Sequence, residues 1–135
     1  MSTLKTGKVK TTTIADELDT ESTAVTNVIN GSAKAWINFN GSTDAILSSF
    51  NVTSLTNVGT GRHTINFTTA FNDINYCVVT GNNDYGADGG LRTTGVDNHI
   101  AKTTSSVSIS TKYNSSGSVG TLVDYSVQNG VVVFN

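Results

Sequence analysis

Short runs in which apolar and polar residues alternate dominate the chain from residue 33 onward. Within residues 35–40, Ala, Ile and Phe alternate with Trp, Asn and Asn, the period of two that sends successive side chains to opposite faces of a β-strand. No stretch keeps the 3.6-residue period of a long amphipathic helix. Further strand-like runs cover residues 50–56, 63–68, 76–80, 107–113, 122–128 and 131–134. The pattern predicts an all-β domain of about seven antiparallel strands, folded as a β-sandwich or a barrel-like knob.

Turn-forming residues join two pairs of these runs. Residues 50–56 and 63–68 flank a loop with two glycines, so we expect a hairpin in which Phe50 faces Ile65 or Phe67.

The second pair lies at the end of the chain, where residues 122–128 and 131–134 flank Asn129-Gly130. Asn-Gly between two alternating runs is the strongest two-residue hairpin signal. The sequence therefore predicts a second hairpin that turns at these two residues.

The run at residues 131–134 is apolar on both faces, and the run at 35–40 carries Trp36 on the face opposite its other apolar residues. A strand with two apolar faces must be covered twice, and the second cover often comes from another subunit. Trp36, Val132 and Phe134 are therefore candidates for a subunit interface. The alternative is a strand inside the sandwich with one residue at its rim.

The first part of the chain has a different composition. Residues 1–35 contain no aromatic residue, whereas all ten aromatic residues lie between Trp36 and Phe134. The apolar residues of this first part are too sparse to bury a face on their own. We expect residues 1–32 to form an extended arm with little regular structure beyond a helical turn at 15–19, and residues 33–135 to form the knob. The candidate arm contacts are Leu4, Val9, Ile14, Leu18, Val25 and Ile29.

Charge and composition limit the possible partners. The 135 residues include 8 Lys plus Arg and 10 Asp plus Glu, a net charge of −2, and only 13% are charged. Such a chain lacks the basic surface that binds nucleic acid or anionic lipid. Its start does not resemble a signal peptide and no run is apolar enough for a membrane span, so we expect synthesis in a cytoplasm. Cys77 is expected to be a buried, inert thiol.

Residues capable of catalysis are few. His63 and His99 lie in a predicted strand and a predicted loop, without a nucleophile motif, so a hydrogen-bonded strand histidine and an exposed loop histidine account for both. Asp73 and Asp124 are the acids that a glycosidase pair would need, yet nothing in the sequence brings them together. We therefore predict a protein that is not an enzyme and has no cofactor.

The longest predicted loop region, residues 81–102, is the candidate recognition surface. Amide and aromatic side chains of this kind suit contacts with sugars or proteins. Its candidate contact residues are Asn82, Asn83, Tyr85, Arg92, Asn98 and His99, and residues 114–120 form a second candidate loop.

The same region also contains closely spaced acids among glycines. Asp84, Asp88 and Asp97 faintly resemble an oxygen-rich cation loop, but their spacing matches no EF-hand. A solvated, Gly-rich connection is the interpretation that we prefer, with no metal bound.

A family resemblance adds to this reading. It is carried by Gly31-Ser-Ala-Lys-Ala-Trp-Ile-Asn-Phe-Asn-Gly41, by Ala45-Ile, Ser49-Phe-Asn-Val52, Gly59-Thr-Gly61, Thr64-Ile-Asn-Phe-Thr68 and Tyr76, and by the opening Met1-Ser-Thr-Leu-Lys. In these segments, which cover most of residues 31–80, the chain resembles small tail-fibre and related virion proteins of marine and freshwater tailed bacteriophages, including those of cyanobacteria. The resemblance implies a non-enzymatic, commonly trimeric structural protein whose N-terminal arm attaches to the virion.

The expected function is therefore that of a virion structural protein, a short homotrimeric tail or baseplate fibre. It would bind other virion proteins through its arm and contact a glycan or protein of the host surface through its loops. A capsid decoration (cement) protein that braces capsomer junctions is the alternative. A carbohydrate-binding β-domain without a virion role is the second alternative.

Overall fold

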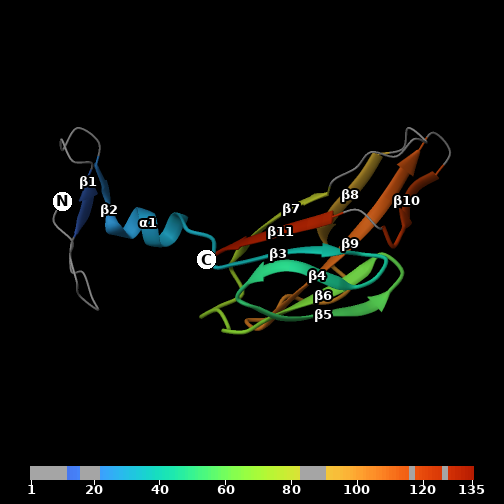
Figure 1. Cartoon of the computed structure of the whole chain (residues 1–135), viewed down its shortest axis with the longest axis horizontal. Coiled ribbons are helices and arrows are strands. Elements are labelled where there is room, and N and C mark those ends of the chain that lie inside the picture. Colours follow the sequence, from blue (N-terminus) through green and yellow to red (C-terminus); the bar gives the residue numbers. More distant parts are fainter. Residues whose placement is uncertain (1–11, 16–21, 83–90, 116–117, 126–127) are drawn as a thin grey trace. The chain divides into compact units, whose positions relative to one another are not determined.

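The computed structural model of the chain separates into two compact units, Met1–Ser32 and Ala33–Asn135 (Figure 1). The described residues are 12–15, 22–82, 91–115, 118–125 and 128–135. They form eleven strands and one helix, and every strand pairing among them is antiparallel. The expectation of an all-β antiparallel fold is confirmed.

The first unit has more regular structure than the sequence led us to expect. Strands β1 (Thr13–Ala15) and β2 (Ser22–Ala24) pair as a small antiparallel sheet, and helix α1 (Val25–Gly31) follows directly. The backbone N–H of Val25 donates to the carbonyl of Thr12, 3.0 Å away, so the start of the helix is tied to the sheet. In the described residues of this unit, the expectation of little regular structure therefore does not hold. The helical turn expected at 15–19 falls almost entirely outside the described residues.

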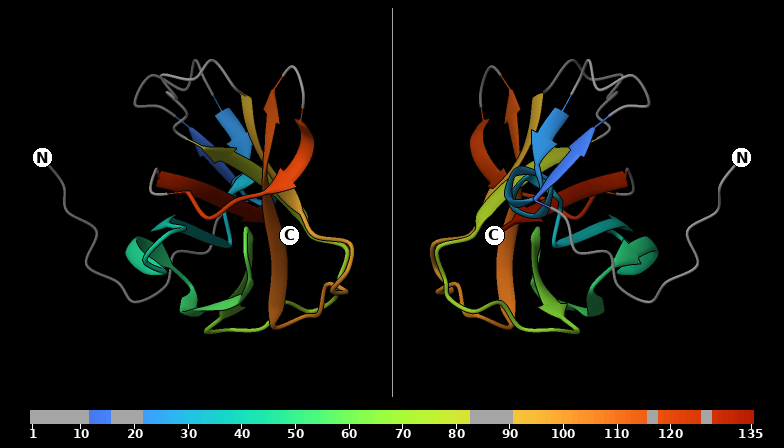
Figure 2. Two further views of the ribbon diagram at one scale, coloured as in Figure 1. Left: turned by 90° about the vertical axis from the view of Figure 1, so that its right-hand side faces the viewer. Right: turned by 90° about the vertical axis from the view of Figure 1, so that its left-hand side faces the viewer.

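The second unit is a sandwich of two sheets (Figure 2). One sheet has four strands in the order β4-β3-β11-β7. The other sheet has five: β5 pairs with β6, β6 and β10 pair one after the other along one edge of β9, and β8 pairs with the other edge of β9. The four-stranded sheet contains β3 (Ala35–Asn40), β4 (Ala45–Phe50), β7 (Cys77–Asn82) and β11 (Gln128–Phe134). The five-stranded sheet contains β5 (Val52–Gly59), β6 (Arg62–Phe67), β8 (Leu91–Val96), β9 (Ser106–Ser115) and β10 (Ser118–Leu122). The two sheets do not close into a barrel.

The core lies between the sheets and follows the alternation of the sequence. On β3 and β6 every second residue is buried, which is the pattern of strands with one face inward. The four-stranded sheet contributes Ala35, Ile37, Phe39, Val131 and Val133 to the buried cluster, and the five-stranded sheet contributes Ile65, Phe67, Val107 and Ile109, with Tyr76 beside them. One apolar core therefore holds the two sheets together.

Strand β9 carries two partners in succession along one edge, first β6 and then β10. Gly61 stands at the junction, with φ +66°, and its carbonyl accepts the N–H of Thr111 at 2.8 Å. A Cβ atom at this position would lie 2.6 Å from the Val123 nitrogen and 2.7 Å from the Thr111 oxygen. Only glycine fits both this backbone conformation and this close approach.

The hairpin expected at residues 50–68 is present as β5 and β6, but Phe50 does not belong to it. Phe50 ends β4 and lies opposite Trp36 in the other sheet, whereas Leu55 and Val52 face Ile65 and Phe67. The reason is Asn51, which adopts φ +54° and turns the chain from one sheet to the other.

The hairpin expected at Asn129-Gly130 is absent. Strand β11 runs straight through both residues, and Asn129 lies opposite Phe39 on one side and Asn82 on the other. Because β11 is a central strand with partners on both edges, pairing outweighs the local turn preference of Asn-Gly. The sandwich has nine strands instead of about seven. Strands β4, β8 and β10 were not predicted, and the strand predicted at 122–128 is wrong, because β10 ends at Leu122, residues 123–125 belong to no strand and β11 begins at Gln128.

Cys77, expected to be buried, is exposed, because it lies opposite Phe134 on the outward side of the edge strand β7.

Across the described ranges, no helix is long and apolar enough to cross a membrane.

Candidate functional site

The two histidines lie in the expected elements, but each contacts an acid that the sequence did not reveal. His63 is buried on β6, and its Nε2 lies 2.9 Å from the Asp44 carboxylate. Asn57 donates to both oxygens of the same carboxylate at 3.1 Å. The hydrogen bond from His63 lowers the pKa of Asp44, and that from Asn57 lowers it further. The Phe39 ring, 5.2 Å from the imidazole, completes the surroundings.

His99 belongs to a second cluster on the outer side of the five-stranded sheet. Its Nδ1 and its backbone N–H lie 3.1 and 3.0 Å from Oδ1 of Asp97, while Nε of Arg62 lies 3.1 Å from Oδ2. Asp97 is only 3% exposed. Burial by itself would raise the pKa of Asp97, but the two contacts with His99 and the charge of Arg62 outweigh it and lower the pKa.

Both clusters have the form of structural contacts, in which a buried or half-buried acid is bonded to side chains of the fold. Among the described residues, no hydroxyl or thiol is hydrogen-bonded to either imidazole, so neither histidine has a nucleophile to activate. Both clusters join segments that are distant in the sequence, and this stabilising role accounts for the geometry.

The other two described acids, Asp73 and Asp124, each accept a backbone hydrogen bond. Asp73 lies in the connection from β6 to β7 and accepts the N–H of Asn75 at 2.7 Å. Asp124 follows β10 and accepts the N–H of Gly61 at 2.6 Å. Asp84 and Asp88 lie outside the described residues. In the described ranges no three His, Cys, Asp or Glu side chains come together as metal ligands.

The predicted recognition loop is largely strand where the structure describes it. Asn82 ends β7 and donates to the Thr94 hydroxyl at 3.3 Å, and residues 91–96 form β8. Asn98 and His99 are exposed in the following turn, while Asn83 and Tyr85 lie outside the described residues. Of the candidate loop 114–120, residues 114–115 end β9 and residues 118–120 begin β10, whereas residues 116–117 lie outside the described ranges.

Arg92 is not available for recognition. It is 6% exposed, and its guanidinium carbon lies 3.8 Å from the centre of the Tyr125 ring and 5.0 Å from that of Tyr113. The cation is held by two aromatic rings inside the unit, an arrangement that stabilises the fold.

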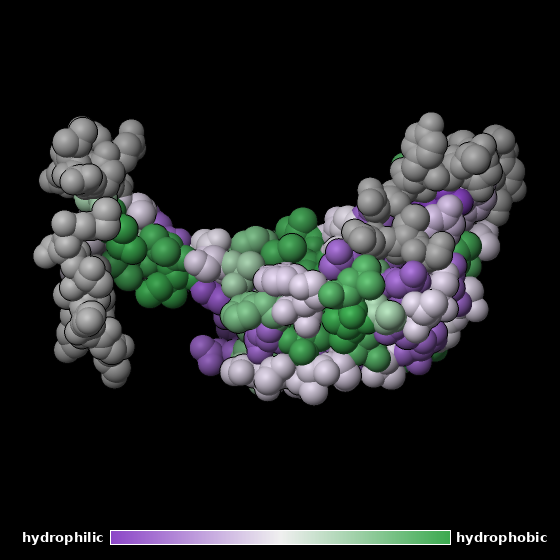
Figure 3. All heavy atoms as spheres, in the orientation of Figure 1, coloured by the Kyte–Doolittle hydropathy of each residue, from purple (hydrophilic) through white to green (hydrophobic). Residues whose placement is uncertain are grey.

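The candidate interface residues belong to an apolar row on the outer face of the four-stranded sheet. Trp36 lies opposite Phe50 on one side and Val132 on the other, and Val132 lies opposite Val79. We call these four residues, one from each strand, the outer apolar row. Phe50 is 54% exposed, Val79 53% and Trp36 36%. Phe134 lies on the same face, and Figure 3 shows hydrophobic side chains gathered over this sheet.

The candidate arm contacts are described only in part. Ile14 on β1 and Ile29 on α1 are exposed, and Val25 is half-buried, whereas Leu4, Val9 and Leu18 lie outside the described residues. Val28 on α1 is exposed as well. The described part of the first unit therefore presents apolar side chains to solvent.

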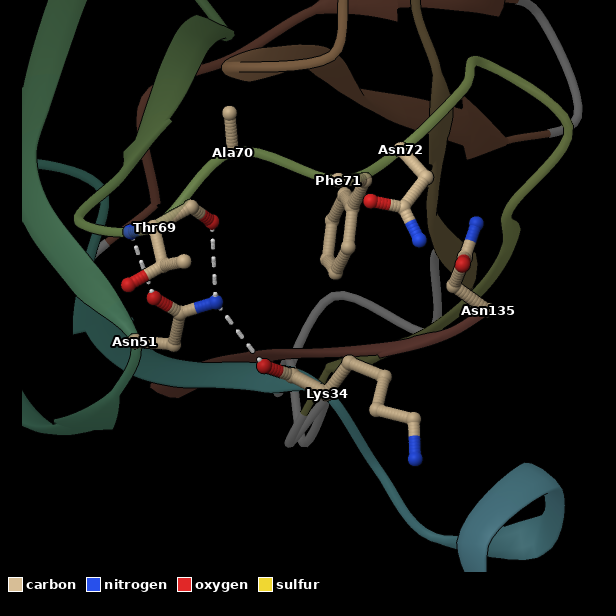
Figure 4. Close-up of a pocket in the computed structure, with 7 residues that line it drawn as sticks. All are labelled: Lys34, Asn51, Thr69, Ala70, Phe71, Asn72 and Asn135. Atoms are coloured by element: carbon tan, nitrogen blue, oxygen red, sulfur yellow. Dashed lines mark hydrogen bonds between the residues drawn. The ribbon is translucent and has the colours of Figure 1, made fainter. Parts of the chain in front are cut away.

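A small open pocket of about 260 Å³ lies where β3 begins and β11 ends (Figure 4). Asn51 forms one wall: its amide donates to the carbonyls of Lys34 and Thr69 and accepts the N–H of Thr69 at 2.7 Å. The other lining residues are Ala70, Phe71, Asn72 and Asn135.

Sequence reasoning did not select this pocket. Phe71 and Asn72 follow the predicted strand at 63–68, in a segment without a motif, and only the fold brings them to Asn51 and Asn135. The one usable signal was Asn51, a residue that tolerates positive φ, directly after an apolar run.

Comparison with known proteins yields no relative: no family model matches the chain, and no curated protein or solved structure is significantly similar to it.

Proposed function

We propose that the chain is a structural protein of a phage virion, a short fibre of the tail or baseplate that assembles as a homotrimer through the outer apolar row. The observation that carries the assembly role is this row, which crosses all four strands with three side chains at least one-third exposed. Contiguous apolar surface of this kind is typical of an interaction site. The virion role and the number three rest on the family resemblance.

The first unit supports the attachment part of the proposal. Its helix and first strand present Ile14, Val28 and Ile29 to solvent, and an apolar surface on so small a unit favours a partner that covers it. Attachment to another virion protein would supply that cover.

The assembly role is tested by the mass of the purified full chain in analytical ultracentrifugation. We expect three times the chain mass for the unmodified protein, and the mass of a single chain for Val79→Lys, because a lysine in the row would bury an unpaired charge. Val58→Lys is the matched control, since Val58 is 42% exposed on β5 of the other sheet. A single-chain mass for the unmodified protein at every concentration, or dissociation by Val58→Lys as well, would contradict the proposal.

The virion role is tested by the copy number in purified phage particles, measured by quantitative mass spectrometry. A small number of copies that is a multiple of three supports a fibre. Hundreds of copies per particle would instead support the cement alternative, which uses the same two surfaces, and absence from particles would contradict both.

A further inference from the structure

We infer that the pocket beside Phe71 binds one neutral hexopyranose unit of a glycan, with the sugar ring on the Phe71 ring and its hydroxyls on the amides of Asn72 and Asn135. This inference does not depend on the assembly role, because every lining residue belongs to the second unit of a single chain.

The aromatic ring is held in place from behind. Phe71 packs edge-on against Phe67, with 4.7 Å between ring centres, and in a tilted arrangement against Tyr76, with 5.0 Å between ring centres. Its backbone N–H donates to the carbonyl of Thr104 at 2.8 Å, and the Tyr76 hydroxyl donates to the carbonyls of Thr103 and Ser106. The ring is thus fixed before a ligand arrives, which lowers the entropic cost of binding, yet it stays partly exposed toward the pocket.

The opposite wall is equally fixed. The three hydrogen bonds of the Asn51 side chain join the start of β3 to residue 69, and the Asn51 carbonyl accepts the N–H of Thr68 at 3.2 Å. Asn51 has thereby used its amide within the fold, so it shapes the pocket and leaves recognition to other groups.

Two amides remain for a ligand. Asn72 and Asn135 are exposed, and their side chains make no hydrogen bond within the described part of the chain. Figure 4 shows both amides on the same side of the Phe71 ring. A primary amide donates and accepts at once, which suits the neighbouring hydroxyls of a sugar.

The chemistry of the lining selects the class of ligand. An apolar ring face beside uncharged donors and acceptors matches a pyranose, which has an apolar face of C–H groups and a rim of hydroxyls. Lys34 is the only lining residue with an ionisable side chain, and Figure 4 shows its ammonium group directed away from Phe71, so the side chains that face the ring favour a neutral ligand. The volume of about 260 Å³ is below the range of roughly 300–1,000 Å³ for drug-sized ligands, which limits the site to one ring.

The test is a titration of the isotope-labelled full chain followed by nuclear magnetic resonance. The probes are the methyl glycosides of glucose, mannose and galactose, with sorbitol as the matched control, since sorbitol has the hydroxyls but no ring. We expect saturable shifts of the Asn72 and Asn135 side-chain amides with at least one glycoside, with millimolar affinity, and no saturable shift with sorbitol.

Two variants locate the site. Phe71→Leu keeps an apolar side chain but removes the ring, and Asn72→Ala removes one exposed amide that the fold does not use; each should weaken binding about tenfold. Asn98→Ala, an exposed amide in the turn after β8, should leave the affinity unchanged. If Phe71→Leu does not fold, the glycoside affinity of Asn72→Ala alone tests the site.

Several results would overturn the inference. These are the absence of saturable shifts at Asn72 and Asn135 with all three glycosides, equal shifts with sorbitol, or undiminished binding by Asn72→Ala. None of them bears on the mass of the assembly, so failure here is distinct from failure of the proposed fibre role.

Discussion

The two outer faces of the sandwich have opposite chemistry although they enclose the same core. On the five-stranded sheet, Thr64 and Ser108 bond through their hydroxyls at 2.7 Å, and the Asn66 amide donates to Ser54 and Thr56 at 3.0 Å. On the four-stranded sheet, the outward side chains are instead those of the outer apolar row, namely Phe50, Trp36, Val132 and Val79.

The difference distinguishes outward side chains that are satisfied within the fold from outward side chains that a partner surface would cover. Cross-strand pairs of hydroxyls and amides satisfy one another and are also compatible with water. A row of large apolar side chains stabilises the sheet by the same cross-strand contacts but keeps part of its surface in water, where it is unfavourable. The four-stranded sheet therefore gains free energy when a further surface covers the outer apolar row.

Outside the core, the largest expected effect tests how rigidly the five-stranded sheet is built. Gly61→Ala should lower the free energy of unfolding by about 3 kcal/mol, because the new Cβ meets backbone atoms and the positive φ disfavours alanine. Gly81→Ala on the apolar sheet is the control, since its Cβ would meet nothing within 4 Å, and it should change the value by less than about 0.5 kcal/mol. Urea denaturation measures both, and equal losses would refute this account of Gly61.

Removing the centre of the apolar row should cost less. Trp36→Ala should lower the free energy of unfolding of the dissociated chain by about 2 kcal/mol, because the side chain is packed on its neighbours but about one-third exposed. Phe39→Ala, in the core directly between the sheets, should cost about 4 kcal/mol. A loss for Trp36→Ala as large as that for Phe39→Ala would mean that the row is buried within one chain.

Acid should weaken the attachment of the segment after β8 to the polar sheet. The lowered pKa of Asp97 means that its ionised form stabilises the folded chain above about pH 4, and this contribution disappears as the pH falls through the lowered pKa. Asp97→Asn should cost about 1.5 kcal/mol at pH 7, and this cost should shrink as the pH falls below about 4. Thermal denaturation across this pH range measures the difference, and a cost of Asp97→Asn that stays constant with pH would contradict this account.

The smallest effect concerns the hydrogen-bonded pairs of the polar face. Asn66→Ala removes two hydrogen bonds and should lower the free energy of unfolding by about 1 kcal/mol. Ser48→Ala on β4, whose hydroxyl makes no hydrogen bond with the described residues, should stay within about 0.5 kcal/mol of the unmodified chain. If the two variants lose the same amount in urea denaturation, the polar pairs do not stabilise the sheet.

Much of the sandwich could be predicted because, in several strands that contribute to the core, inward apolar residues alternate with outward residues that are mostly polar. The runs that became β3, β6 and the start of β9 have this pattern, and their inward residues form the core. Strand β8 contains Arg92, two threonines and a glycine, and β4 lies at an edge with mostly exposed residues, so neither carries the apolar alternation on which the prediction relied.

The sequence misled where a local preference was outweighed by tertiary pairing. Asn129-Gly130 favours a turn, but two neighbouring strands hold it extended. Of the candidate interface, Trp36 was found from its unusual position on a polar face, while Val79 and Phe50 became its partners only through strand register. The pocket could not have been predicted, since it joins residues from both ends of the unit.

The pairing of β3 with β11 has a consequence for protein engineering. The backbone N–H of Lys34 donates to the carbonyl of Val133 at 2.8 Å, so the second unit begins and ends at nearly the same point. A chain with this arrangement can be circularly permuted or inserted as a whole into a surface loop of a host scaffold without stretching its connections.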